Sequence, residues 1–131
     1  MEAVKLMMQT ADWKTEKHVP VIEAEGVINK GELAKIAVTV GKEIAHPNTT
    51  EHHIAWITLY FLPKGEKFPY QIGKYDFTAH GASIQGPNTS TIFTSPIVTA
   101  SLKTDKAGTI IAVAYCNIHG LWGNEKELDI K

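Results

Sequence analysis

Short runs of β-forming residues recur along this chain, and this repetition constrains the fold more than any other feature. Turn residues separate the runs, as in Pro63-Lys64-Gly65 and Gly86-Pro87-Asn88. No stretch has the pattern of a long amphipathic helix. The strands are expected at residues 19–24, 33–41, 53–62, 70–78, 97–103, 109–116 and 126–130.

The run at residues 33–41 has the alternation of a strand with one buried face. Ile36, Val38 and Val40 stand two residues apart and therefore share one face. Several such strands at intervals of about 8 to 12 residues are typical of a sandwich or barrel. We predict an all-β fold, an immunoglobulin-like β-sandwich of about seven strands.

The length and composition favour a single domain. A chain of 131 residues can bury one hydrophobic core, so residues 1–131 are expected to form one domain, with a flexible or neighbour-contacting segment at 1–11. Hydrophobic residues make up 44% of the chain, without an apolar run long enough to span a membrane. The first residues lack the pattern of a secretory signal, so a cytoplasmic location is expected.

The net charge and the cysteine count limit the kinds of partner and cross-link that this chain can have. The formal net charge is -1 and the lysines are scattered, so the basic surface needed for nucleic acid is missing. Cys116 is the one cysteine, which excludes a disulfide within the chain. A lone thiol suits a reducing compartment or a metal site.

Histidines provide the candidate chemistry. There are six, at positions 18, 46, 52, 53, 80 and 119. Cys116 and His119 are three residues apart at the end of an apolar strand, where the chain reversal can aim both at one ion. Thiolate and imidazole ligands suit iron, copper or zinc and do not suit calcium or magnesium.

Each of these residues also has a simpler interpretation. A cysteine at the end of an apolar strand is often a small buried hydrophobe. Neighbouring residues of a strand point to opposite faces, so one of His52 and His53 at most should reach a shared metal, and we expect His53 to be hydrogen-bonded or exposed. His80, beside a glycine, is expected to finish a strand. Glu16 and Lys17 would ordinarily be a solvated pair.

Three motifs together resemble the superoxide reductases, in the short neelaredoxin form of the desulfoferrodoxin family. The motifs are Glu16-Lys17-His18-Val19-Pro20, Gly41-Lys42-Glu43-Ile44-Ala45-His46-Pro47-Asn48-Thr49-Thr50-Glu51-His52-His53 and Tyr115-Cys116-Asn117-Ile118-His119-Gly120-Leu121-Trp122. The family's larger members carry a further iron domain held by four cysteines, which a chain with one cysteine cannot form. The resemblance implies an immunoglobulin-like sandwich and a single iron per chain.

The resemblance also implies the site. Matching positions give one cysteine ligand and four histidine ligands to iron: Cys116, His18, His46, His52 and His119. Glu16 is then expected to occupy the sixth iron position in the oxidised state, and Lys17 to lie beside the open position. Ala45 stands where related sequences often have proline, which could loosen this loop slightly.

The activity implied is the one-electron reduction of superoxide to hydrogen peroxide, a detoxification reaction. The family's electron donor is rubredoxin or a similar small protein, and its short forms often assemble as dimers or tetramers. Lys17 is expected to attract superoxide and to help deliver a proton. Backbone N–H groups near Ile118 and His119 are expected to hydrogen-bond the sulfur of Cys116.

Two other functions fit part of the pattern. An all-β chain with a Cys-x-x-His element also suits a blue-copper electron-transfer protein, but that site uses an axial methionine. Met1, Met7 and Met8 all precede the histidines, which argues against copper. A sandwich stabilised by zinc is the other alternative, although closed zinc sites need four ligands and this chain offers more.

Overall fold

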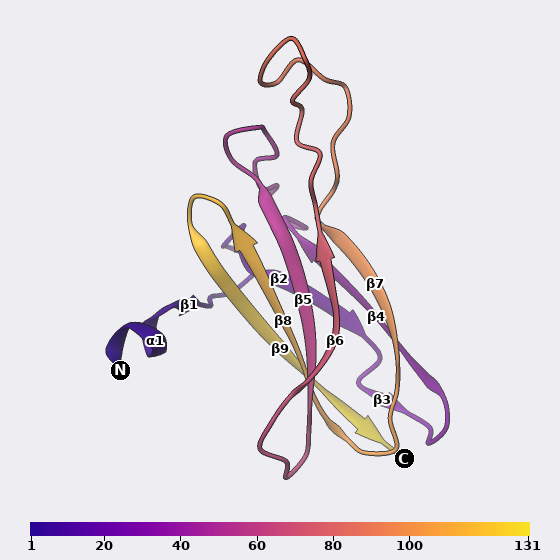
Figure 1. Cartoon of the computed structure of the whole chain (residues 1–131). Helices are drawn as coiled ribbons and strands as arrows, with labels where there is room; N and C mark the ends of the chain where they lie inside the picture. The colour runs from indigo at the N-terminus through magenta and orange to yellow at the C-terminus, as the bar shows by residue number, and fades with distance from the viewer.

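Two β-sheets packed face to face form the body of the protein (Figure 1). The computed structural model describes residues 1–131. The elements in chain order are α1 (Glu2–Leu6), β1 (Met8–Gln9), β2 (Pro20–Ala24), β3 (Val27–Ile28), β4 (Leu33–Val40), β5 (Ile54–Pro63), β6 (Tyr70–Asp76), β7 (Ile97–Lys103), β8 (Gly108–Cys116) and β9 (Gly120–Ile130). The predicted all-β sandwich is confirmed.

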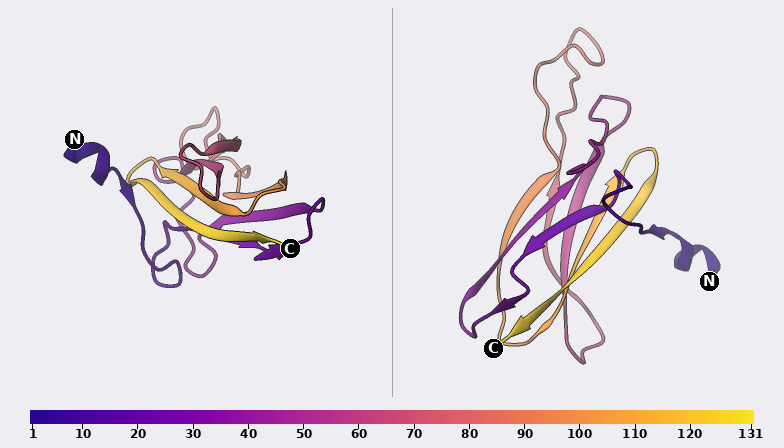
Figure 2. Two further views of the ribbon diagram at one scale, coloured as in Figure 1. Left: turned by 90° about the horizontal axis from the view of Figure 1, so that it is seen from below. Right: turned by 180° about the vertical axis from the view of Figure 1, so that it is seen from behind.

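The larger sheet has the strand order β1-β9-β8-β5-β6, and β3 also pairs with β9. The smaller sheet has the order β2-β4-β7. All pairs are antiparallel except the two short parallel pairs that β1 and β3 make with β9. Figure 2 shows the two layers from below and from behind.

Apolar side chains that alternate along the strands fill the space between the sheets. In β4, Ile36 and Val38 point inward, as their spacing predicted, and both are almost fully buried. In β5 and β8, Leu59 and Ile110 are fully buried in the same 17-residue core. Because both layers contribute one apolar face, the core is continuous from end to end.

The strand predictions misplace the start of one strand and miss two short strands. β9 begins at Gly120, six residues before the predicted start at residue 126. Gly120, Gly123 and Asn124 have low strand propensity, but pairing along β8 from Cys116↔Gly120 onward imposes the strand. β1 and β3 have two residues each, too few for a periodic pattern.

The N-terminal segment contains α1 and β1. The pairing of Met8 with Leu121 attaches this segment to β9, and α1 stands away from the sandwich (Figure 2). Its apolar residues Val4, Leu6 and Met7 are exposed. No helix of the structure has the length and hydropathy of a membrane span.

One end of the sandwich gathers the segments that carry the candidate ligands. The strand registers put the start of β2 beside the end of β4, and the start of β5 beside the end of β8. A β-bulge between Ile54 and Trp56 interrupts the pairing of β5 with β8 next to Cys116. Bulges of this kind redirect nearby side chains.

Candidate metal centre

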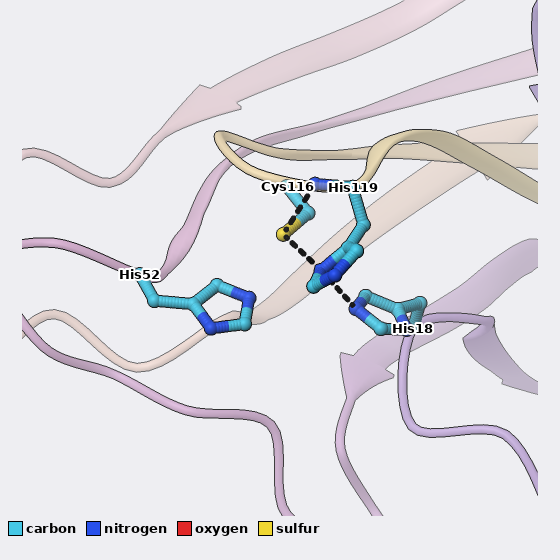
Figure 3. Close-up of side chains that lie close together, drawn as sticks. All are labelled: His18, His52, Cys116 and His119. Atoms are coloured by element: carbon cyan, nitrogen blue, oxygen red, sulfur yellow. Dashed lines mark hydrogen bonds between the residues drawn. The ribbon is translucent and has the colours of Figure 1, made fainter.

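Four side chains converge at this end of the sandwich: those of His18, His52, Cys116 and His119 (Figure 3). One potential ligand atom from each lies within 4.8 Å of all the others. In Figure 3 the rings of His18 and His119 are adjacent, and His52 reaches toward them from a separate loop. The group therefore joins segments that are distant in sequence.

Local structure explains how each ligand candidate is aimed. Cys116 is the last residue of β8 and continues its inward-facing series, so its sulfur is fully buried at the end of the core. His119 follows in the turn that leads to β9, whose Gly120 has φ 81°. His18 lies just before β2, and His52 just before β5.

His46 lies beside these four residues but is not one of them. Its ring centroid is 4.8 Å from that of His18 and 4.9 Å from that of His52. Its Nδ1 donates to the Pro47 carbonyl oxygen over 2.7 Å, which leaves Nε2 with a free lone pair. The Nε2 atoms of His46 and His52 are both buried without a hydrogen-bond partner.

Burial favours the neutral form of these two histidines. Desolvation is the main cause that lowers the pKa of His46 to about 4, and the charges of His18, His52 and Lys17 lower it further. Desolvation also lowers the pKa of His52, helped by the charge of His119. Neutral imidazole is the form that binds metal.

Glu16 fixes the tautomer of His18. The Glu16 carboxylate accepts hydrogen bonds from the His18 ring Nδ1 at 2.6 Å and from its backbone N at 3.0 Å. These bonds to His18 hold the pKa of Glu16 below its ordinary value. Since Nδ1 carries the proton, the His18 Nε2 lone pair faces the cluster, where it lies 3.1 Å from Nδ1 of His119. Carboxylate–histidine pairs of this kind orient metal ligands.

The sulfur of Cys116 has its own hydrogen-bond donor. The backbone N of His119 donates to Sγ over 3.3 Å, which is one of the contacts expected from the sequence. Trp122 supports both neighbouring histidines: its ring stacks on His18 with centroids 4.8 Å apart, and its Nε1 donates to the His119 carbonyl. The His119 backbone thus supports the sulfur, and Trp122 supports the His18 ring and the backbone of His119.

The donor set fits a transition metal. Nitrogen ligands about 2.1 Å from an ion and at right angles lie roughly 3 Å apart, compared with 3.1 Å between His18 Nε2 and His119 Nδ1. Two buried, unpartnered imidazole nitrogens would otherwise carry an uncompensated desolvation cost. Thiolate with imidazoles selects iron, copper or zinc. Met8, by contrast, packs against Gly123 on β9. Met1 and Met7 are exposed in the N-terminal segment, so no methionine joins the cluster as a blue-copper site needs.

His53 and His80 lie outside the cluster and form a pair of their own. Their rings stack in parallel, with centroids 3.5 Å apart and an interplanar angle of 2°. His80 is 8% exposed, and burial lowers its pKa. The structure therefore brings His52 to the cluster and directs His53 away from it.

Sequence reasoning assigned no role to Asn117, which joins two ligand-bearing loops. Its side chain accepts from the backbone N of His53 at 2.8 Å and donates to the Glu51 carbonyl at 2.8 Å. Its backbone N donates to the His53 carbonyl at 3.2 Å. Its place directly after Cys116 was the available signal, but its partners lie too far away in sequence to be identified from spacing.

Comparisons with known proteins agree with this geometry. Residues 10–125 match the family model for desulfoferrodoxin. The chain is 61% identical over 122 residues to a superoxide reductase of Pyrococcus furiosus, covering 93% of this chain and 96% of that one.

Solved structures agree as well. A crystal structure from Thermotoga maritima superposes with a TM-score of 0.95 at 52% identity, covering 98% of this chain and 97% of that chain. The superoxide reductase (neelaredoxin) of Archaeoglobus fulgidus in its reduced form superposes with a TM-score of 0.87 at 56% identity, covering 94% and 98%.

Proposed function

This chain belongs to the desulfoferrodoxin family, and from that membership we propose that it is a superoxide reductase. The observation that carries the proposal is the convergence of one buried thiol and three histidines from separate segments. A fourth histidine, His46, lies alongside with its Nε2 unpartnered. Similarity to named superoxide reductases over more than nine-tenths of the chain supports the same conclusion.

We propose that the residues hold one iron ion per chain. Its ligands are the sulfur of Cys116 and one nitrogen from each of four histidines: His18, His46, His52 and His119. Iron in this site would supply the single electron that superoxide needs. The overall reaction joins one superoxide, one electron and two protons into one hydrogen peroxide.

Lys17 supplies the positive charge at the site. It lies directly beside His18, and its charge contributes to lowering the pKa of both His46 and His52. A cation next to the site attracts a small anion such as superoxide. The ammonium group also orders water from which a proton is delivered to the product.

Glu16 has two roles in the proposal. In the structure its carboxylate is bound to His18 Nδ1, where it orients that ring. The family resemblance implies a second role, in which this carboxylate would also serve as a ligand of oxidised iron. A Glu16→Gln variant tests both roles, because an amide keeps the size of the side chain but loses its charge.

The proposal extends to partners and place of action. A small electron donor such as rubredoxin returns one electron to the centre after each turnover. The exposed apolar residues of the N-terminal segment, Val4, Leu6 and Met7, support assembly into a dimer or tetramer, because apolar patches of this kind often pack against another chain. A lone free thiol suits the reducing cytoplasm.

The stoichiometry of product formation tests the reductase activity. Reduced, iron-loaded protein is mixed with superoxide, and hydrogen peroxide and oxygen are both quantified. A reductase yields one peroxide for each superoxide consumed and releases no oxygen. One peroxide and one oxygen for every two superoxide ions would instead identify a dismutase and contradict the proposal.

A further inference from the structure

The loop at residues 41–53 carries two of the proposed ligands but contains no regular secondary structure. Its internal hydrogen bonds join near neighbours in sequence and include those from Thr49 N to the His52 carbonyl, from His52 N to the Thr49 hydroxyl, and from the rings of His46 and His53 to the carbonyls of Pro47 and Thr49. The position of the whole loop depends also on what it contacts outside itself. On the side next to Cys116, Asn117 accepts a hydrogen bond from the loop's last residue, His53.

A second loop, at residues 77–96, holds the other side. Thr50 N donates to the Asn88 side-chain oxygen at 3.0 Å, and Asn88 N donates to the Thr50 hydroxyl at 3.2 Å. The Asn88 amide donates to both carboxylate oxygens of Glu51. In Figure 1 this second loop rises beyond the strands at the same end as the ligand-bearing loop.

His80 is the buried residue at which the two loops meet. Its ring Nε2 lies 2.6 Å from the Phe77 carbonyl oxygen and its Nδ1 lies 2.9 Å from the side-chain oxygen of Asn48. The amide nitrogen of Asn48 donates to the Thr94 carbonyl at 3.0 Å. That bond ties Asn48 to the second loop.

Three residues of the ligand-bearing loop contact His80 directly. Asn48 meets its ring nitrogen, the Thr50 hydroxyl donates to its carbonyl at 3.0 Å, and the His53 ring stacks on its face. Asn48 lies between the two ligand histidines in sequence, and His53 follows the second. The His80 ring makes the contacts with Asn48 and His53, and its backbone carbonyl makes the contact with Thr50.

We propose that His80 is a positioning residue for the metal centre. Through Asn48 and His53 it holds the loop at the place where His46 and His52 present their nitrogens to the ion. The inference rests on the proposed function, since it takes those two histidines as ligands. His80 itself is not a member of the cluster.

Cobalt(II) binding tests this role without relying on catalysis. The metal-free protein is titrated with Co²⁺, and the ligand-field and thiolate absorption bands report how the ion is held. For His80→Ala we expect the affinity for Co²⁺ to fall about 10- to 100-fold, the usual effect of removing a residue that supports a ligand. The ligand-field bands should also move, which a purely structural loss of stability would not cause in folded protein.

Asn48→Ala provides a second variant that leaves the buried ring in place. It should reproduce the weaker binding and the band shift, and the loss in the double variant should be smaller than the sum of the two single losses, because both variants remove the contact between Asn48 and His80. Thr89→Ala is the matched control: its hydroxyl bonds Ser83 and the Gly86 carbonyl inside the second loop. It should bind Co²⁺ like the unmodified chain.

The outcomes separate the two proposals. If the unmodified chain binds Co²⁺ with a thiolate band, and folded His80→Ala and Asn48→Ala bind it with equal affinity and the same spectrum, His80 has no positioning role. An equal loss in Thr89→Ala would overturn the inference as well, since any change in the loop would then suffice. If the unmodified chain binds no metal through its thiolate, the proposed function itself fails.

Discussion

The body of the sandwich and its ligand-bearing end are held together by different interactions. Of 57 backbone hydrogen bonds, 39 lie within the helix and strands, and the core between the sheets consists of buried apolar side chains. At the ligand-bearing end, side-chain amides and hydroxyls such as those of Asn48, Thr50 and Asn88 join the loops at residues 41–53 and 77–96. The Asn117 amide joins the first of these loops to the turn after β8.

This difference separates stability from metal binding. Burial of apolar area is nondirectional and stabilises the whole fold. Side-chain hydrogen bonds each contribute about 1 kcal/mol, but their geometry determines where the ligands lie. Substitutions in the core of the body should therefore lower the unfolding free energy without changing metal binding. Substitutions in the loops should weaken metal binding with little effect on the unfolding free energy.

Leu59→Ala should produce the largest effect and should confine it to the body. Leu59 is fully buried in the middle of β5, so its truncation leaves a cavity and should cost about 2–5 kcal/mol of unfolding free energy. Denaturant unfolding measures the loss. Protein that remains folded should keep its visible spectrum and its rate with superoxide, and a loss of either would mean that the two regions are not independent.

Cys116→Ser should have the converse effect. Replacing the thiolate removes the one soft ligand, so we expect the reaction with superoxide to slow on the order of 100-fold or more and the thiolate absorption to disappear. The substitution is nearly isosteric, so circular dichroism should report an unchanged sandwich. A variant that retains the rate and the absorption would show that the sulfur is not a ligand.

The pattern of alternating residues predicted most of the body, although it misplaced the start of β9 and missed β1 and β3. Alternating apolar residues such as Ile36 and Val38 identify their strand because one face of the sheet is buried away from water. The ligand candidates could be identified too, since Cys116 and His119 stand in recognisable motifs. The contacts that position them could not, because Asn117 and His53 are 64 residues apart and His80 and Asn48 are 32 apart.

Acid should destabilise the metal-free protein through its buried histidines. His46 titrates near its ordinary pKa of 6.5 when unfolded and at about 4 when folded, so the unfolded state binds more protons between these values. Stability should therefore fall as the pH drops from 6.5 toward 4, by about 1–2 kcal/mol from this residue after allowance for partial exposure.

Urea unfolding of the metal-free protein across this pH range measures the effect, with His46→Gln as the control. The variant should lose part of the pH dependence because the titrating ring is gone. An identical pH dependence in both proteins would place the titration elsewhere.

Lys17→Ala should have the smallest effect of the four. Removing one charge next to the site should reduce the rate of association with superoxide about tenfold at low salt and weaken its dependence on ionic strength. Lys64→Ala is the matched control, since Lys64 is exposed in the turn after β5, at the opposite end of the sandwich. Equal rates for the two variants would remove Lys17 from the mechanism.

The most direct test of the central claim is metal analysis of the purified protein together with its visible spectrum before and after superoxide is added to the reduced form. The account predicts about one iron per chain, a colourless reduced state, and a coloured oxidised state that superoxide produces along with peroxide. Full native occupancy by zinc or copper, with no spectral response to superoxide, would contradict it.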